Sequence, residues 1–268
     1  MINLVVFSKN RPMQLQALLD SIRLNAKGVF SPVTVVYKAD SEEYENGYKL
    51  LMERMPWAAI YKRQDDFKND IMSAIDNSTE FTCFAADDDI VFDKFNEGLL
   101  KCFDDSDVCC FSLRLGKNID HCYSNDKPNK LEPEYEYMDE FLKWKWAEQS
   151  LDFGYPLSVV SHIFRTKFIK ELTDKISFKN PNTYEAELQA LVQECKPKMA
   201  SYKQSKIVGV PANSVNSSWT NRNGLIHSYS TEELVDKYLY GQIIDIEYIK
   251  MGTIHSAQQE IEYVFKQI

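Results

Sequence analysis

The chain has 268 residues, 44% of them hydrophobic and 26% charged, and this composition predicts a soluble globular protein with a sizeable core. Its formal net charge of −9 argues against a partner that is nucleic acid, because a general nucleic-acid binder needs a basic surface. No apolar run approaches the roughly 18 residues of a membrane-spanning helix, and the first residues enter an apolar run without a basic start. We therefore expect a cytoplasmic protein with no transmembrane segment and no signal peptide. Peripheral association with the inner face of the membrane stays open.

The first half of the chain alternates apolar runs with amphipathic segments. The apolar runs predict strands at 2–7, 33–37, 59–61, 81–92 and 108–114. Apolar residues at helical spacing predict helices between them, at 12–22, 41–55, 67–75 and 95–103. This alternation implies an α/β fold with a mostly parallel sheet flanked by helices. In such sheets ligands bind beyond the carboxyl ends of the strands.

The second half is less regular. The turn-rich segment 114–135 is interpreted as a surface loop or lid, and the aromatic segment 140–146 as helical or irregular. Further strands are expected at 159–164 and 206–210, and helices at 166–175, 184–194 and 231–240. A short strand or extended piece is expected at 243–250. No repeat, low-complexity segment or linker is found, which favours one domain.

Three consecutive carboxylates, Asp87, Asp88 and Asp89, interrupt the apolar run 81–92. Adjacent like charges repel, and burying them is costly unless a cation neutralises them. Carboxylate oxygens suit Mg²⁺ or Mn²⁺, and Mg²⁺ usually takes one or two carboxylates together with substrate phosphates. We therefore predict a metal site for a diphosphate at a strand end. A solvated acidic turn is the alternative.

Other polar residues are expected at the same edge of the sheet. Arg11, Lys38 and Asp40 follow the first two predicted strands, and Asp87 to Asp89 end a later one. The carboxyl ends of parallel strands meet at one edge, so these side chains are predicted to converge on a ligand. This convergence favours a binding site over a plain acidic turn.

Three features occur in a fixed order along the chain. An opening strand leads into Ser8-Lys9-Asn10-Arg11-Pro12 and a helix, and an Asp-x-Asp signature, Asp87-Asp88-Asp89, ends a central strand. A later strand, 161–165, is followed by a helix and then by Asn180-Pro181-Asn182-Thr183-Tyr184-Glu185. Up to about residue 230, this order resembles nucleotide-sugar glycosyltransferases of the GT-A fold, especially the family-2-like transferases. The resemblance implies one Rossmann-like GT-A domain over 1–268. Its nucleotide-sugar-binding half is about 1–114, and an acceptor-binding α/β half with a C-terminal lid is about 115–268.

The resemblance also implies roles on the donor side. Asp89 would ligate Mn²⁺ or Mg²⁺, Asp87 would contact the ribose or the metal, and a late histidine, His227, would be a third ligand. A purely structural role is the alternative for His227. The other residues expected around the nucleotide-sugar are Arg11, Lys38, Asp40, Asp65, Asp66, Asp88 and Arg222. Trp219 is expected to cover the donor as part of a lid at 211–230, which donor binding would order.

An inverting transferase needs a carboxylate that accepts the proton of the acceptor hydroxyl. Glu185 stands three residues before Leu188 and matches the second acid of the pattern in the family, whereas Tyr184 departs from the first. Glu187 and Asp152 are the alternatives for this catalytic role. A helix-start glutamate also interacts favourably with the helix dipole, which is the structural interpretation of Glu185.

We therefore expect a glycosyltransferase that moves one sugar from a nucleotide-diphosphate sugar to a glycan or a lipid-linked saccharide acceptor. The transfer is expected to be metal-assisted and inverting. One alternative is a nucleotidyltransferase that acts on sugar phosphates, although 8–12 lacks the glycine-rich phosphate loop of such enzymes. The other alternative is a non-catalytic module that binds a nucleotide or a carbohydrate.

Overall fold

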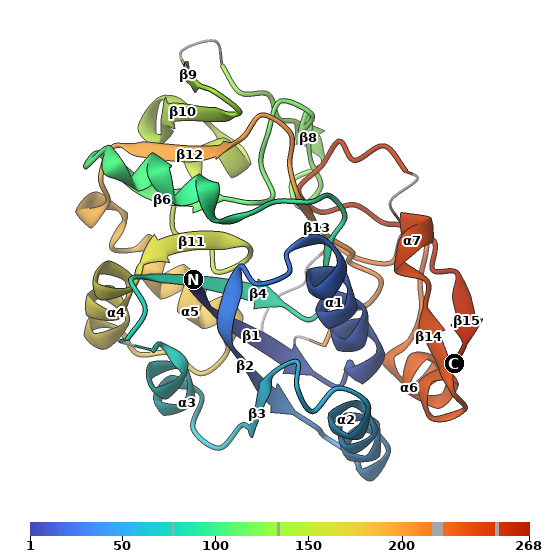
Figure 1. The fold of residues 1–268 in the computed structure, drawn as a ribbon. Helices are drawn as coiled ribbons and strands as arrows, with labels where there is room; N and C mark the ends of the chain where they lie inside the picture. Colours follow the sequence, from blue (N-terminus) through green and yellow to red (C-terminus); the bar gives the residue numbers. More distant parts are fainter. Residues whose placement is uncertain (77, 133–134, 216–221, 250–251) are drawn as a thin grey trace.

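A nine-stranded sheet runs through the molecule, in the order β3-β2-β1-β4-β11-β6-β12-β10-β9 (Figure 1). The computed structural model describes residues 1–76, 78–132, 135–215, 222–249 and 252–268. The strands of the sheet are β1 (Ile2–Lys9), β2 (Phe30–Lys38), β3 (Ile60–Arg63), β4 (Phe81–Ala86), β6 (Val108–Ser112), β9 (Tyr135–Met138), β10 (Phe141–Lys145), β11 (His162–Arg165) and β12 (Lys198–Tyr202). Parallel pairing joins β3, β2, β1 and β4, and β11 and β10 run against the other strands.

Helices and three small sheets complete the fold. The α-helices are α1 (Pro12–Asn25), α2 (Glu42–Arg54), α3 (Phe67–Ala74), α4 (Thr166–Lys175), α5 (Pro181–Gln189), α6 (Thr231–Leu239) and α7 (Ile246–Ile249). Short 3-10 helices span Glu97–Asp104, Trp146–Glu148, Leu151–Gly154 and Val192–Glu194. The small sheets pair β5 (Asp89–Val91) with β13 (Ile207–Gly209), β7 (His121–Cys122) with β8 (Lys127–Pro128), and β14 (Gln242–Ile244) with β15 (Phe265–Gln267).

The central strands β1 and β4 are mostly apolar because helices cover the sheet. All residues of β1 except Lys9 are buried. Phe7 of β1 packs against Phe67 of α3 and Tyr184 of α5, with ring centroids 5.7 and 6.5 Å apart. In Figure 1, α1, α2 and α6 group on one side of the view, and α3, α4 and α5 on the other. Burial on both faces explains why strands 2–7 and 81–86 appear in the sequence as continuous apolar runs.

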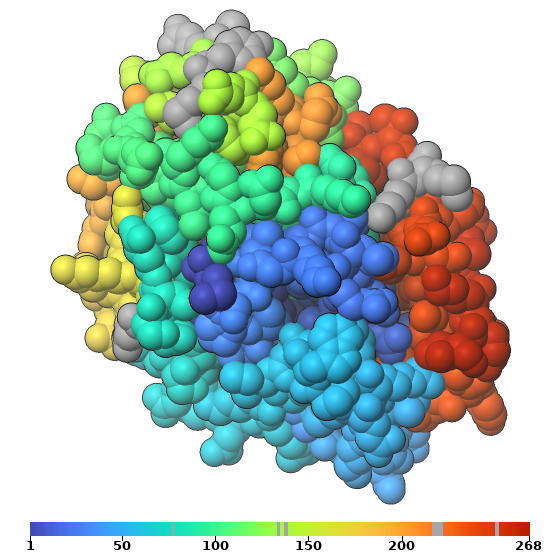
Figure 2. All heavy atoms as spheres, in the orientation of Figure 1, coloured from blue at the N-terminus to red at the C-terminus, as the bar shows by residue number. Residues whose placement is uncertain are grey.

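The C-terminal segment packs against the N-terminal helices. Figure 2 shows this segment, in orange to red, beside the blue N-terminal part of the chain. Helix α6 contacts both α1 and α2. Tyr238 of α6 donates a hydrogen bond of 2.5 Å to Gln16 Oε1 of α1, and both side chains are buried. None of the helices that the structure describes has the length and apolar character needed to cross a membrane.

The predicted α/β class with a mostly parallel sheet is confirmed, and the differences concern individual elements in both halves of the chain. The interpretation of 140–146 as helical or irregular was wrong, because Phe141–Lys145 forms strand β10. Trp144 of β10 lies opposite Met199 of β12, a strand that the sequence analysis did not predict. The five residues Phe-Leu-Lys-Trp-Lys are too few to distinguish a strand from a helix by periodicity alone. Phe141–Lys145 forms a strand because it pairs with β12, whose residues lie more than 50 positions away in the sequence.

Two other expected elements differ from the structure. The segment expected as a helix at 95–103 is a 3-10 helix at Glu97–Asp104. The strand expected over 81–92 divides at Asp87 and Asp88 into β4 and β5, which belong to different sheets. This division places a tight turn with two carboxylates at the end of a central strand.

Candidate active site

A pocket of about 760 Å³ opens at the carboxyl ends of β1, β2, β4 and β6. Strand β1 lies between β2 and β4 in the sheet. After β1 the chain passes through α1 to β2, which lies on the side of β1 away from β4, so the connections after β1 and β4 diverge at this edge. Such a switch in connection direction is where open α/β sheets bind ligands. The charged residues that line the pocket are Lys9, Arg11, Lys38, Asp87, Asp88, Arg114, Asp152, Lys179, Glu185 and Arg222.

Arg11 holds the acidic turn together. Its Nη1 lies 3.0 Å from Asp87 Oδ1 and 2.9 Å from Asp88 Oδ2. Its remaining nitrogens donate to Asn213, from Nε to Oδ1 at 2.8 Å and from Nη2 to the carbonyl oxygen at 2.5 Å. The guanidinium is buried and fully engaged, so it serves chiefly to neutralise the carboxylates and to anchor the chain at Asn213.

Asp87 uses both of its oxygens within the protein. Oδ1 pairs with Arg11, and Oδ2 accepts from Ser8 Oγ at 2.9 Å and from the Lys9 amide at 3.0 Å. Burial raises the pKa of Asp87 to about 6, against the opposing effect of the Arg11 charge. The Tyr48 hydroxyl supports this network, since it lies 2.6 Å from Ser8 Oγ and accepts from the Arg11 amide at 3.2 Å.

Asp89 lies behind the turn and does not line the pocket. It is 1% exposed, and its Oδ2 accepts from the Ala86 amide at 3.1 Å and from Ser161 Oγ at 3.0 Å. Burial raises its pKa to about 7, and the neighbouring charge of Asp88 acts in the same direction. These bonds tie β5 to β4 and to the residue before β11.

Of the three aspartates, Asp88 best fits a divalent cation that is shared with a phosphate. Its side chain is 20% exposed, it lines the pocket, and its Oδ1 has no hydrogen-bond partner among the described residues. No group of three or more histidine, cysteine, aspartate or glutamate side chains that could hold a metal occurs in the described part of the chain. The residues therefore suit the mode in which one or two carboxylates and substrate phosphates bind the ion together.

Glu185 lies on the opposite wall of the pocket, in the second turn of α5. Its Oε2 accepts from Ser158 Oγ at 3.0 Å and from the Val159 amide at 2.8 Å. Burial first, and then the charge of the nearby Glu185 carboxylate, raise the pKa of Tyr155 above its usual range. Helix α5 starts with a capping box, in which Asn180 Oδ1 accepts from the Thr183 amide at 2.9 Å.

Asp152 also lines the pocket, near Arg114 and Asn129. Its Oδ2 accepts from Asn129 Nδ2 at 2.7 Å, and its Oδ1 lies 3.8 Å from Arg114 Nη2. Lys38 and Arg222 line the pocket as well, and Arg222 donates to Asp126 Oδ1 at 2.6 Å. The structure thus brings Arg11, Lys38, Asp87, Asp88, Asp152, Glu185 and Arg222 to one pocket.

Several other predicted site residues lie outside the pocket lining. Asp40 pairs with Lys9 Nζ at 2.9 Å at the rim, and Asp66 caps α3 by accepting from the Asn69 amide at 2.8 Å. The Asp65 amide donates to Asp70 Oδ2 at 2.8 Å. The His227 amide donates to Glu260 Oε2 at 2.9 Å, and Glu187 is exposed on α5. Trp219 lies outside the described residues.

Four residues of the pocket network were not among the sequence predictions. Ser8 lies at the carboxyl end of β1 and Arg114 comes two residues after β6, so the rule that placed Arg11 at the site would have found them as well. Tyr48 lies within α2 at a position that its spacing assigns to the core, and Asn213 lies in an irregular segment. No local pattern distinguishes Tyr48 or Asn213 from structural residues.

Comparisons with known proteins give weak matches in structure alone. No family model matches the chain, and no curated relative matches its sequence. Among solved structures, S. aureus TarS 1-349 is 13% identical with a TM-score of 0.47, over 77% of this chain and 60% of that chain. The same fragment in complex with UDP-GlcNAc is 15% identical with a TM-score of 0.46, over 77% and 58%. A cytidylyltransferase from Leptospira borgpetersenii is 8% identical with a TM-score of 0.42, over 76% of each chain.

This chain therefore spans less than two thirds of the TarS fragment. The identities and TM-scores are too low to assign an activity, so the function must follow from the pocket itself.

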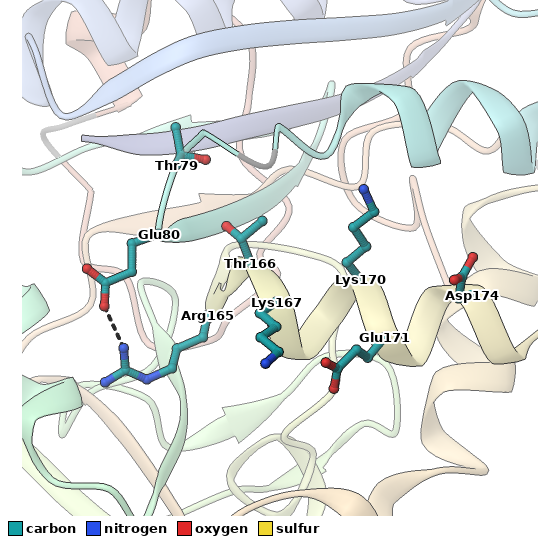
Figure 3. Close-up of a pocket in the computed structure, with 8 residues that line it drawn as sticks. All are labelled: Thr79, Glu80, Arg165, Thr166, Lys167, Lys170, Glu171 and Asp174. Atoms are coloured by element: carbon teal, nitrogen blue, oxygen red, sulfur yellow. Dashed lines mark hydrogen bonds and ion pairs between the residues drawn. The ribbon is translucent and has the colours of Figure 1, made fainter.

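A second, more open hollow of about 610 Å³ lies at the other end of the sheet, beside the start of β4 and helix α4 (Figure 3). Its charged side chains are Glu80, Arg165, Lys167, Lys170, Glu171 and Asp174. Arg165 is already engaged, with Nη1 2.6 Å from Glu80 Oε1 and Nη2 2.6 Å from the Phe103 carbonyl oxygen. The mixed charges and the distance from the strand ends make this hollow a surface feature that offers no convergent chemistry.

Proposed function

We propose that this protein is a GT-A-type glycosyltransferase that moves one sugar from a nucleotide-diphosphate sugar to a glycan or a lipid-linked saccharide. The observation that carries the proposal is the pairing of two features across one pocket. The acidic turn Asp87-Asp88 lies at the diverging ends of β1 and β4, and the Glu185 carboxylate faces the same pocket from α5. A donor site and a proton acceptor are the two parts that sugar transfer to a hydroxyl requires.

On the donor side, the proposal assigns the diphosphate to the edge formed by β1, β2 and β4. Asp88 would hold Mn²⁺ or Mg²⁺ through its open oxygen, and the ion would neutralise charge on the departing diphosphate. Lys38 and Arg222 line the same pocket and supply further positive charge. Arg11 keeps Asp87 and Asp88 in place, because its own donors are all directed to the protein.

On the acceptor side, the proposal assigns the general base to Glu185. Ser158 and the Val159 amide fix its Oε2, and this leaves Oε1 to accept the proton of an acceptor hydroxyl. A carboxylate held in one orientation loses less entropy when the acceptor binds. Direct attack of that hydroxyl on the sugar carbon inverts its configuration. Asp152 is held by Asn129 and is the second candidate for this role.

The proposal is tested by ligand-induced stabilisation followed by turnover. UDP, GDP, CDP and dTDP are each added with Mn²⁺ at increasing concentration, and the melting temperature is measured. One nucleoside diphosphate should raise it, because a ligand that binds only the native state stabilises by mass action. The matching nucleotide-sugars are then assayed for release of nucleoside diphosphate with saccharide acceptors. Stabilisation by none of the four would contradict the donor site, and stabilisation without turnover would favour a binding module.

A further inference from the structure

Arg114 is a buried cation that the protein does not pair closely. It follows β6 at the carboxyl edge of the sheet, lines the pocket and is 9% exposed. Its Nε is buried and has no hydrogen-bond partner among the described residues. The carboxylate oxygen with which it is paired, Asp152 Oδ1, lies 3.8 Å from Nη2, which is too long for a hydrogen bond.

This arrangement contrasts with that of Arg11 in the same pocket. Arg11 directs its nitrogens to two carboxylates and to Asn213 at 2.5 to 3.0 Å. At Arg114, the other oxygen of Asp152 is taken by Asn129 Nδ2, so Asp152 is not free to close the gap without losing that bond. A buried N–H donor without a hydrogen-bond partner, such as Nε of Arg114, costs stability in the unliganded protein. A ligand with a carboxylate or a phosphate would recover that cost, since guanidinium binds two oxygens of either group through paired N–H donors.

Arg114 lies on the acceptor side of the pocket. Strand β11 separates β6, which Arg114 follows, from β4, which carries the acidic turn. Arg114 lines the same pocket as the proposed base Glu185 and the acidic turn Asp87-Asp88.

We propose that Arg114 recognises an oxyanion, a carboxylate or a phosphate, on the sugar acceptor, so that the substrate is an acidic rather than a neutral saccharide. This inference rests on the proposed function, because it takes Glu185 as the mark of the acceptor side. It narrows the acceptor class from any glycan to one that carries a negative group near the reacting hydroxyl.

The binding test uses the full chain with Mn²⁺ and a saturating concentration of whichever of UDP, GDP, CDP and dTDP stabilises the protein. Glucuronate, glucose 6-phosphate and glucose are titrated at matched ionic strength, and binding is followed by saturation-transfer NMR. At least one acidic sugar should bind with a Kd roughly tenfold or more below that of glucose, as expected for a charge-assisted bidentate contact of about 1.4 kcal/mol or more. Preference for glucuronate identifies a carboxylate, and preference for glucose 6-phosphate identifies a phosphate.

Variants separate recognition from structure. Arg114→Gln should bind acidic and neutral sugars alike. Arg114→Lys should retain part of the preference for acidic sugars, because lysine keeps the positive charge but lacks the paired N–H donors of the guanidinium. Lys167→Gln, in the separate hollow of Figure 3, is the matched control and should keep the full preference. The melting temperature of Arg114→Gln without ligand should equal or exceed that of the wild type, because no protein hydrogen bond is lost.

Three results would overturn the inference. The first is that the acidic and neutral sugars bind equally, or that none of the three sugars binds. The second is a preference for acidic sugars that survives in Arg114→Gln. The third is a marked loss of stability in unliganded Arg114→Gln, which would make Arg114 a structural partner of Asp152. Stabilisation by the nucleoside diphosphate and Mn²⁺ without any sugar is measured in the same protein, so the donor site of the proposed function stands or fails independently of these results.

Discussion

Asp87, Asp88 and Asp89 are consecutive in the sequence but lie in three different environments. Asp87 is saturated by Arg11, Ser8 and the Lys9 amide, whereas Asp88 keeps one oxygen open to the pocket. Asp89 is buried behind the turn, where it receives two hydrogen bonds. Replacing Asp89 by alanine would remove two buried hydrogen bonds and so would cost stability as well as any metal ligation. Asp88 is therefore the sharper test of metal use, and the roles of all three stay predictions.

Asp88→Asn is expected to remove dependence on a divalent cation together with most of the activity. The amide keeps the size of the side chain and an acceptor oxygen but lacks the charge that holds a hard cation. Activity is measured in wild type and variant with added Mn²⁺, with EDTA, and after Mn²⁺ is restored. The wild type should lose activity in EDTA and regain it with Mn²⁺. Full wild-type activity in EDTA would show that transfer does not need the metal.

Glu185→Gln is expected to lower kcat by about 10²–10⁴ while donor binding is nearly unchanged, because the amide cannot accept the proton. Glu187→Gln is the matched control on the same helix, since Glu187 is exposed and lies outside the pocket lining. Calorimetry with the donor and steady-state kinetics are measured on both variants. If donor binding falls with kcat in Glu185→Gln, the carboxylate serves the donor or the fold. If turnover is unaffected, Asp152 is the next residue to replace.

At the scale of elements, helix α5 positions the proposed base. The helix begins at Pro181 directly after Asn180, and the capping box holds its first turn at the pocket. Tyr184 anchors the same turn in the core, where its ring lies 4.3 Å from that of Phe178 and its hydroxyl lies 2.7 Å from Thr173 Oγ1. Glu185 follows Tyr184 directly, so the packing of the helix also sets the position of the carboxylate.

Asn180→Ala is expected to reduce the free energy of unfolding by about 0.5–2 kcal/mol, because the first turn of α5 loses its side-chain cap. Asn180→Asp keeps an acceptor for the Thr183 amide and should stay within a few tenths of a kcal/mol of the wild type. Denaturant unfolding at pH 7 measures both changes. Equal stability of the alanine and aspartate variants would show that the cap contributes nothing to the fold.

At the scale of the whole molecule, a histidine buried between strands links folding to pH. His162 of β11 is 1% exposed, and its Nδ1 lies 3.3 Å from the Pro156 carbonyl oxygen. Burial first, and then the positive charge of Arg114, lower the pKa of His162 to about 3 from an ordinary value of 6.5. The unfolded chain therefore binds a proton below pH 6.5 that the folded chain does not bind until about pH 3.

His162→Gln is expected to reduce the loss of stability on acidification. Between pH 6.5 and pH 3 the unfolded wild-type chain takes up the extra proton, so this residue removes stability progressively as the pH falls, by a few kcal/mol in all. Glutamine does not titrate and abolishes this part of the dependence. The difference in unfolding free energy between the two proteins is measured at several values from pH 7 to pH 4. If the difference in unfolding free energy between wild type and His162→Gln is constant over this range, the pKa of His162 does not differ between the folded and unfolded states.

The sequence by itself determined the α/β class, the order of most strands and helices in the first half, and the edge of the sheet where a site would form. These properties follow from apolar periodicity and from the geometry of parallel strands, which local sequence encodes. Only the tertiary structure decided which polar residues meet. Arg11 contacts Asn213 across 202 positions, and Trp144 lies opposite Met199 between β10 and β12. Asp152 likewise meets Asn129 at 2.7 Å and Arg114 at 3.8 Å, across 23 and 38 positions. Such pairings depend on contacts between distant segments, which no local pattern of residues specifies.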